Sequence, residues 1–372
     1  MENNLSDNNS GSTSRLMQLC FGYFFFYIIT GVGVKFFLKT GDGFPGLPGM
    51  EYLFYSTLAS TVLVTAIVLI LRWYRLDSVR KITVCGITMP SELPYIVFSG
   101  ICTAVVVPTT TLLYTFDHIS VMVAMIIMRG SVIIIGRIVD AIQIKQGILK
   151  KKVFMEENIA MCIALFAVLI KAFTGGSDGK ESPFSSIPFM VIFLSYILAY
   201  MFRIYIMNYY KNTRTRPAEE KAAKKDNNKA FFAIEQIASF TTMLLVTICV
   251  LIAAGKFGVT GPRIDPFSKA FFNTNWDWAI WAGIVGCAYG INAFFSVFIF
   301  MFKGRTATFA NLANRLTSLI AGTLSTVIFA AVFGGKYPAL IDWVSLGFIF
   351  LAIWFMAKAE KRRKAEMTAS AK

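Results

Sequence analysis

The sequence predicts an all-α polytopic membrane protein with ten transmembrane helices, arranged as two inverted five-helix repeats with both termini in the cytoplasm. Three observations predict this fold class. The 372-residue chain is 56% hydrophobic and only 15% charged, with a mean hydropathy of +0.62, so it has too little polar surface for a soluble globule of 41.4 kDa. Apolar segments recur along the chain, and one motif occurs twice, half a chain apart.

The apolar segments have the length and composition of membrane-spanning helices. About 20 residues are needed to cross the hydrocarbon as a helix. The segments are continuous and rich in Leu, Ile, Phe and Ala, whereas a membrane β-barrel alternates apolar and polar residues. The ten predicted spans are 16–35, 52–71, 93–114, 119–138, 159–173, 188–210, 231–254, 276–302, 306–333 and 340–357.

The basic residues predict the orientation, because short basic loops stay on the cytoplasmic side. Of the 36 Lys and Arg residues, 24 fall in the termini and every second loop, and only six in the other loops. Both termini are therefore predicted to be cytoplasmic. The net charge of +15 reflects this topology, so no nucleic-acid partner is expected. A bacterial inner membrane and a eukaryotic endomembrane both fit this orientation.

The duplicated motif places one arginine inside an apolar segment of each half. The pattern A-x-I-x-x-R-x-S-x-x-I-x-G at 124–136 recurs as A-x-L-x-x-R-x-T-x-x-I-x-G at 310–322, offset by 186 residues. Its arginines, Arg129 and Arg315, both fall near mid-membrane, where a charge costs from roughly 2.5 to over 10 kcal/mol. Five spans per half is an odd number, so the second half is predicted to be inverted.

The spans and loops divide the chain into a few expected regions. They are a disordered cytoplasmic tail (1–15), the first repeat (16–173), an outer linker (174–187), the second repeat (188–358) with a charged cytoplasmic loop (211–229), and a basic cytoplasmic tail (359–372).

Two stretches around the fourth span resemble a known family. The run L-Y-x-x-x-x-I-S-V at 113–121 and M-R-G-S-V-I-I at 128–134, with the 5+5 spans, resemble the drug/metabolite transporter superfamily, especially its solute carrier 35 and EamA-type branches. The resemblance implies a ten-helix carrier with alternating access, in which the third, fourth, eighth and ninth helices line the cavity. It also implies that carriers of nucleotide sugars or sugar phosphates use basic residues on the helices where Arg129 and Arg315 lie.

The residue types near these arginines suit an anionic substrate. The planar guanidinium fork of arginine matches carboxylate or phosphate, and its weak hydration makes desolvation tolerable. Asn311 and Asn314 share the ninth span with Arg315, and Asn292 lies in the eighth. We interpret these five side chains as candidate substrate contacts.

A structural role for the two arginines is the alternative. Glu235, Asp140 or helix-end carbonyls would then hold them. Glu235, the one acid deep in a span, has two functional options: counter-ion, or proton-coupling carboxylate if desolvation raises its pKa. Arg203 is nearer the inner surface and is expected to extend its side chain to the interface.

Two further patterns concern helix geometry. Pro108 and Thr109 in the third span predict a bend, as a gate hinge or cavity wall, because proline removes one backbone hydrogen bond. Gly283, Gly286 and Gly290 in the eighth span predict close helix packing.

Catalysis, metals and cofactors find no support in the sequence. His118 is the single histidine, the six cysteines are scattered, and no Walker A or nucleophile motif occurs. No enzyme activity, cofactor or metal site is expected.

The function predicted from these residues is secondary transport of a small polar, anionic metabolite, either a nucleotide sugar or a phosphorylated or carboxylated compound. The expected partners are this substrate and the lipid bilayer, and a homodimer is left open. One alternative is an exporter of amino acids or amphipathic drugs. The other is a non-transporting scaffold or receptor that binds its partner through residues 211–229.

Overall fold

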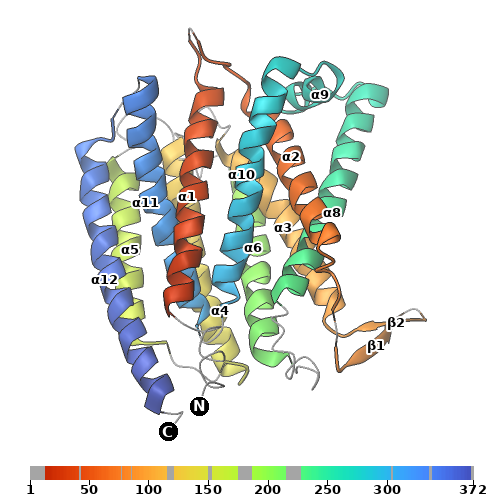
Figure 1. Ribbon diagram of the computed structural model, residues 1–372. Coiled ribbons are helices and arrows are strands. Elements are labelled where there is room, and N and C mark those ends of the chain that lie inside the picture. Colours follow the sequence, from red (N-terminus) through yellow and green to blue (C-terminus); the bar gives the residue numbers. More distant parts are fainter. Residues whose placement is uncertain are drawn as a thin grey trace.

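The computed structural model describes most of the chain. The described residues are 13–41, 43–76, 78–84, 86–114, 121–149, 153–174, 187–214, 228–302, 305–334 and 337–369. Over these residues the protein is a bundle of long helices (Figure 1).

Each predicted apolar segment corresponds to one long helix. The long helices are α1 (Thr13–Leu38), α2 (Gly49–Ile70), α3 (Leu93–Tyr114), α4 (Val121–Lys145), α5 (Met155–Thr174), α6 (Ile187–Thr213), α8 (Asn228–Phe257), α10 (Trp276–Phe300), α11 (Ala307–Phe333) and α12 (Leu340–Ala369).

Three short elements were not expected from the sequence. An antiparallel hairpin of β1 (Lys81–Val84) and β2 (Ile87–Pro90) joins α2 to α3, and α9 (Ile264–Phe272) lies between α8 and α10. Strands of four residues and a helix of nine are too short for their hydrophobic patterns to stand out against the long apolar segments around them.

Within the described residues, eight helices are long and apolar enough to cross a membrane, so the chain is a multi-pass membrane protein. Helices α4 and α5 are not among the eight. Helix α4 carries Arg129, Arg137 and Asp140, and α5 begins with Glu156 and Glu157. Both helices pack inside the same bundle, α4 against α11 and α5 against α12 (Figure 1).

Helix α12 continues well beyond the predicted end of the last span. The stretch expected to be a basic tail is helical through Ala369. Ion pairs bind it to α5: Arg362 contacts Glu156 at 2.7 Å, and Arg363 pairs with Glu157. These contacts hold the end of α12 against the start of α5.

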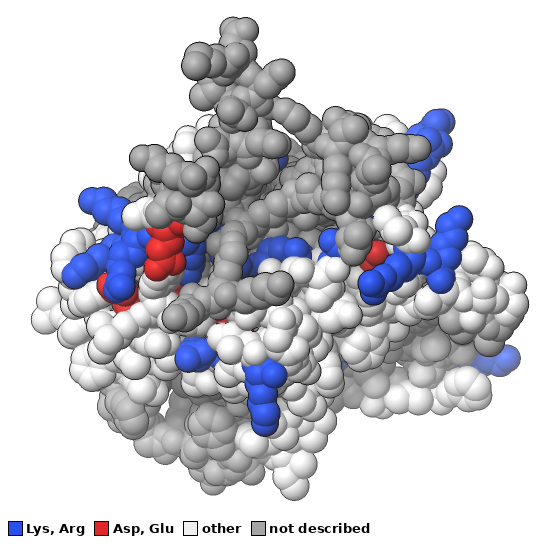
Figure 2. All heavy atoms as spheres, turned by 90° about the horizontal axis from the view of Figure 1, so that it is seen from below, with Lys and Arg blue, Asp and Glu red and all other residues white. Residues whose placement is uncertain are grey.

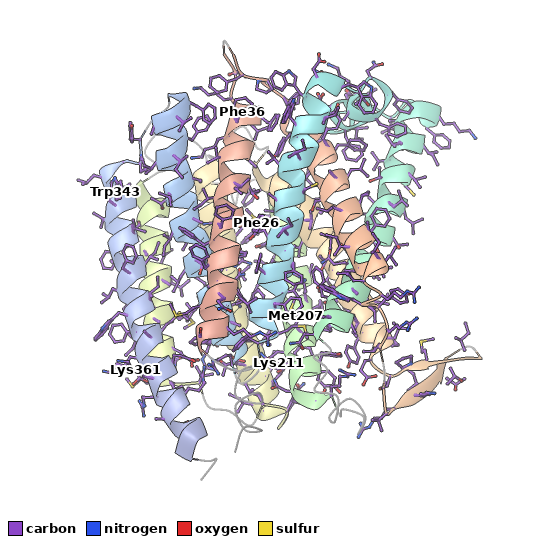
Figure 3. The ribbon with its side chains drawn as sticks, in the orientation of Figure 1. Phe26, Phe36, Met207, Lys211, Trp343 and Lys361 are labelled. Carbon is purple, nitrogen blue, oxygen red and sulfur yellow. The ribbon has the colours of Figure 1, made fainter. Side chains whose placement is uncertain are left out.

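The helices run in two opposite directions between the ends of the bundle. The start of α1 and the end of α12 lie at the same end (Figure 1). In Figure 3, α1 rises from Phe26 to Phe36, whereas α6 descends from Met207 to Lys211 and α12 descends from Trp343 to Lys361. Helices α1 and α6 are therefore antiparallel.

Helix pairs in the two halves of the chain pack alike. Helix α1 packs against α10 and α11, and α6 packs against α3 and α4. Helix α2 contacts α10, and α3 contacts α8. Helices α4 and α11 pack against each other at the centre, and α5 and α12 form a pair at one edge (Figure 1).

Glycines allow the closest of these helix contacts. A Cβ added at Gly286 of α10 would overlap the backbone of Ser56 in α2, and Gly283 and Gly290 face the same helix. The close packing predicted for these glycines is therefore confirmed. Gly100 of α3 similarly faces α8, where an added Cβ would lie 2.6 Å from the carbonyl oxygen of Glu235.

Candidate functional site

The two arginines of the duplicated motif are buried, and each reaches across the bundle to a tyrosine. Arg129 of α4 donates to the hydroxyl of Tyr27 on α1, and its Nη1 lies 3.4 Å from the carbonyl oxygen of Ser318 on α11. Arg315 of α11 donates to the hydroxyl of Tyr200 on α6. The guanidinium carbons lie 5.4 Å and 4.9 Å from the centroids of the Tyr27 and Tyr200 rings, within cation–π range.

Further tyrosines surround these contacts. Tyr23 precedes Tyr27 by one helical turn, and Tyr196 precedes Tyr200 in the same way; the ring centroids are 5.6 Å and 5.2 Å apart. Tyr23 lies within electrostatic range of both arginines and of Tyr200. Tyr289 of α10 is also an electrostatic neighbour of Tyr27, Tyr200 and Arg315. The centre of the bundle is thus a cationic site lined by phenols.

Sequence analysis missed these tyrosines. The signal was present, because the pattern Y-x-x-x-Y at 23–27 of α1 recurs at 196–200 of α6, offset by 173 residues. A tyrosine in an apolar helix is common and carries no charge, so the pattern does not stand out until the arginines are placed beside it.

Glu235 pairs with Arg203 and with neither arginine of the motif. Its Oε1 accepts from Arg203 Nε at 2.9 Å, Ser99 Oγ at 2.7 Å and Thr103 Oγ1 at 3.2 Å, and its Oε2 accepts from Arg203 Nη2 at 3.2 Å. Both partners of the pair are buried. The expectation that Arg203 extends to the interface is wrong, because this carboxylate holds its side chain between α3, α6 and α8.

The Arg203–Glu235 pair predicts a clear stability result. Glu235→Leu alone should lower the free energy of unfolding by about 3–5 kcal/mol, because it leaves a buried guanidinium uncompensated. Arg203→Met combined with Glu235→Leu should recover most of that loss, since both charges are then gone. Melting of the purified variants measures this. A double variant as unstable as Glu235→Leu alone would contradict this pairing.

Asp140 binds the N-terminus of α11. Its Oδ1 accepts from the backbone N–H of Ala307 at 2.9 Å, and its Oδ2 accepts from the N–H and the hydroxyl of Thr308, both at 2.6 Å. Asn208 of α6 adds a fourth contact at 3.4 Å. The first N–H groups of a helix lack partners within it and attract an anion. Both acids offered as counter-ions for Arg129 and Arg315 are therefore engaged elsewhere.

Two of the candidate asparagines, Asn311 and Asn314, hydrogen-bond to neighbouring helices. Asn311 donates to the carbonyl oxygen of Val132 at 2.9 Å and lies against Gly136, so it ties α11 to α4. Asn314 donates to Ser296 of α10 at 3.0 Å.

Several buried polar atoms near the centre make no hydrogen bond within the described part of the chain. A buried group without a partner costs roughly 1–3 kcal/mol, so such groups call for an explanation, for example water or a ligand. They include Oδ1 of Asn292, Asn311 and Asn314, and Nε of Arg315.

Pro108 and Thr109 lie within an unbroken α3. Thr109 Oγ1 donates to the carbonyl oxygens of Val105 at 2.7 Å and Val106 at 3.1 Å, and Thr110 donates to that of Val106 at 2.7 Å. Hydroxyls thus bond carbonyls of the turn that the proline crowds. These hydrogen bonds all lie within α3, and a hinge at Pro108 remains a prediction.

A resident metal has no evident place in the described residues, where no three His, Cys, Asp or Glu side chains come together. His118 lies outside those residues.

Comparisons with known proteins show the fold and nothing of the function. No protein family and no curated protein matches the sequence. A solved structure, described only as the crystal structure of a protein, matches 94% of this chain and 99% of its own chain, with 12% identity and a TM-score of 0.54. At this identity the likeness extends to the architecture alone.

Proposed function

We propose that the chain is a secondary transporter that moves a small polar anion across a membrane by alternating access. One observation carries the proposal: two buried arginines from α4 and α11 meet phenol hydroxyls at the centre, while Glu235 and Asp140 are bound elsewhere. Arginine forks favour carboxylate and phosphate groups, so a phosphorylated or carboxylated metabolite, nucleotide sugars included, is the proposed class.

An inverted repeat is part of the proposal. Three kinds of contact support it: Arg129 binds a tyrosine of the first helix in its own half, Arg315 does the same in the second half, and the helix pairings of the halves correspond. Helices α1 and α6 also run in opposite directions (Figure 3). In this proposal α4 and α5 complete ten spans, and the drug/metabolite transporter resemblance gains support from the arrangement.

Two contacts at corresponding positions of the proposed repeats, made by different residue types, hold opposite ends of the bundle. Lys35 of α1 donates to Thr326 of α11 at one end, and Asn208 of α6 donates to Asp140 of α4 at the other. The tyrosine offset of 173 relates Lys35 to Asn208, and the arginine offset of 186 relates Asp140 to Thr326. We propose that these contacts close opposite ends of the substrate path in turn.

Substrate binding is proposed to exchange one acceptor for another. An entering anion takes the arginine donors that the Tyr27 and Tyr200 hydroxyls now occupy, and it also meets the unused Nε of Arg315. A charge-assisted hydrogen bond to an anion is stronger than one to a neutral phenol. The gain in binding energy then offsets the loss of the contacts that hold the helices.

Removing either tyrosine hydroxyl should lower the stability of the protein but raise its affinity for the substrate. Tyr27→Phe and Tyr200→Phe should each lower the free energy of unfolding without substrate by about 1.5–3 kcal/mol, because a buried guanidinium loses an acceptor. Substrate KM should fall, since the anion no longer competes with the hydroxyl. Tyr205→Phe, which removes an exposed contact on the same helix, is the control. A KM that rises tenfold would mean that the hydroxyls hold the substrate themselves.

A thermal-shift screen of the purified chain tests the proposed substrate class. A ligand that binds only the folded state raises the melting temperature by mass action. Phosphorylated and carboxylated metabolites should raise it, and cationic drugs should not. Stabilisation by amino acids or amphipathic drugs alone would favour the exporter. No ligand at all, together with capture of a partner by residues 211–229, would favour a scaffold.

A further inference from the structure

The β1–β2 hairpin has one apolar face. Its register pairs Ile82 with Met89, and because side chains alternate along a strand, Ile87 lies on the same face as these two. The opposite face carries the pairs of Thr83 with Thr88 and Lys81 with Pro90. The hairpin is thus amphipathic.

The apolar face is open to the surroundings. Ile87 is 65% exposed and Ile82 is 37% exposed, and over the described residues the sheet is two-stranded. The hairpin projects sideways from the bundle, at the end where α2 stops and α3 begins (Figure 1). A two-stranded hairpin is marginally stable in water, so this face calls for a covering surface.

The root of the hairpin is fixed at the end of a membrane span. Helix α2 is apolar and exposed up to Ile70 and Leu71, as expected of a lipid-facing helix. The Trp73 ring then packs on Phe294 of α10, with centroids 5.9 Å apart. The hairpin therefore leaves the bundle at the depth where the hydrocarbon ends.

Positive charge surrounds this root. Four exposed basic residues fall between the end of α2 and the start of the hairpin, against the single acid Asp77: Arg72, Arg75, Arg80 and Lys81. Arg72 has a left-handed backbone with φ of 51°, at a helix-end position usually taken by glycine. Lys and Arg side chains are spread over this end of the molecule (Figure 2).

We propose that the β1–β2 hairpin is an interfacial anchor that binds the anionic lipid leaflet at this end of the bundle. Its apolar face enters the boundary between headgroups and acyl chains, as amphipathic elements do. The four basic residues bind lipid phosphates, each adding to the attraction of the negative surface. The proposal does not depend on what the chain transports.

Hydrogen exchange of the full chain in nanodiscs tests the anchor. The probes are discs of phosphatidylcholine alone and discs that also contain phosphatidylglycerol, each loaded with one copy of the chain. The amides that pair β1 with β2 should exchange roughly tenfold more slowly in the anionic discs. Arg80→Gln with Lys81→Gln should reduce this protection to the level seen in phosphatidylcholine, without touching the apolar face.

Variants of the two faces separate the outcomes. Ile82→Ser with Ile87→Ser should abolish the protection, whereas Thr83→Ser with Thr88→Ser should leave it unchanged. Equal exchange in both kinds of disc would overturn the proposal. A further set of discs is loaded with two copies, and protection that appears only in this set would also overturn the proposal, because a second copy would then cover the face.

Discussion

Arg315→Gln and Arg129→Gln should each reduce uptake of the anionic substrate by more than roughly 100-fold in proteoliposomes. Glutamine keeps a polar side chain but is shorter and removes the charge and the fork. In the proposed mechanism each arginine neutralises part of the substrate, so neither compensates for the other. Glutamine is smaller than arginine and neutral, so it introduces neither a clash nor an uncompensated charge, and the variants should remain folded.

Matched variants separate charge from geometry. Arg315→Lys keeps the charge but loses the planar fork, so partial activity is expected. Arg137→Gln, two turns along α4 from Arg129 and only partly buried, is the arginine control and should retain uptake. Unchanged transport in Arg129→Gln or Arg315→Gln would reject the proposed site and leave the arginines a structural role.

Gly286→Ala should cause the largest loss of stability of any conservative change in α10. The new methyl carbon would overlap the carbonyl oxygen of Ser56 and lie 2.6 Å from its Cα. Backbone atoms cannot move aside as a flexible side chain can, so helices α2 and α10 must separate. Overpacking a tight site costs about 1–3 kcal/mol or more. A lower melting temperature and a poor yield of folded protein in detergent are the expected results.

Gly347→Ala in α12 is the matched control. A Cβ added there meets no atom within 4 Å, so its melting temperature should be unchanged or slightly higher, because alanine is the better helix former. Equal stability of the Gly286→Ala and Gly347→Ala variants would contradict the helix contact described for α2 and α10.

The helices could be predicted from the sequence because each of them depends on local composition. A run of apolar residues such as 93–114 predicts its own helix, and the observed α3 has the same bounds. Glycines spaced along one helix face likewise predict a close neighbour, as Gly283, Gly286 and Gly290 do. Short elements with no such run, the hairpin and α9, could not be found in this way.

Pairing between distant residues could not be predicted, because it depends on how the helices cross. The sequence contains Glu235 and Asp140 at plausible depths, but nothing local says that one binds Arg203 and the other the N-terminus of α11. The repeated motif predicted that Arg129 and Arg315 lie near the centre. It could not predict that Tyr27 and Tyr200 accept their hydrogen bonds, because those contacts join different helices.

The observed pairings define the central site more sharply than a count of charges in the sequence does. With Glu235 and Asp140 engaged elsewhere, the contacts described above for Arg129 and Arg315 are with phenol groups and a backbone carbonyl. At Arg315 the phenols orient the guanidinium without cancelling its charge. This arrangement is the physical reason to expect an anion in preference to a cation or an apolar drug.

Solute exchange in proteoliposomes tests the central claim most directly. The purified chain would be reconstituted into vesicles preloaded with one member of a panel of nucleotide sugars, phosphorylated metabolites, carboxylates, amino acids and cationic drugs. We predict saturable exchange for at least one phosphate or carboxylate class, with none for the cationic drugs. Exchange of cationic drugs alone, or of no member of the panel, would contradict an anion carrier built on Arg129 and Arg315.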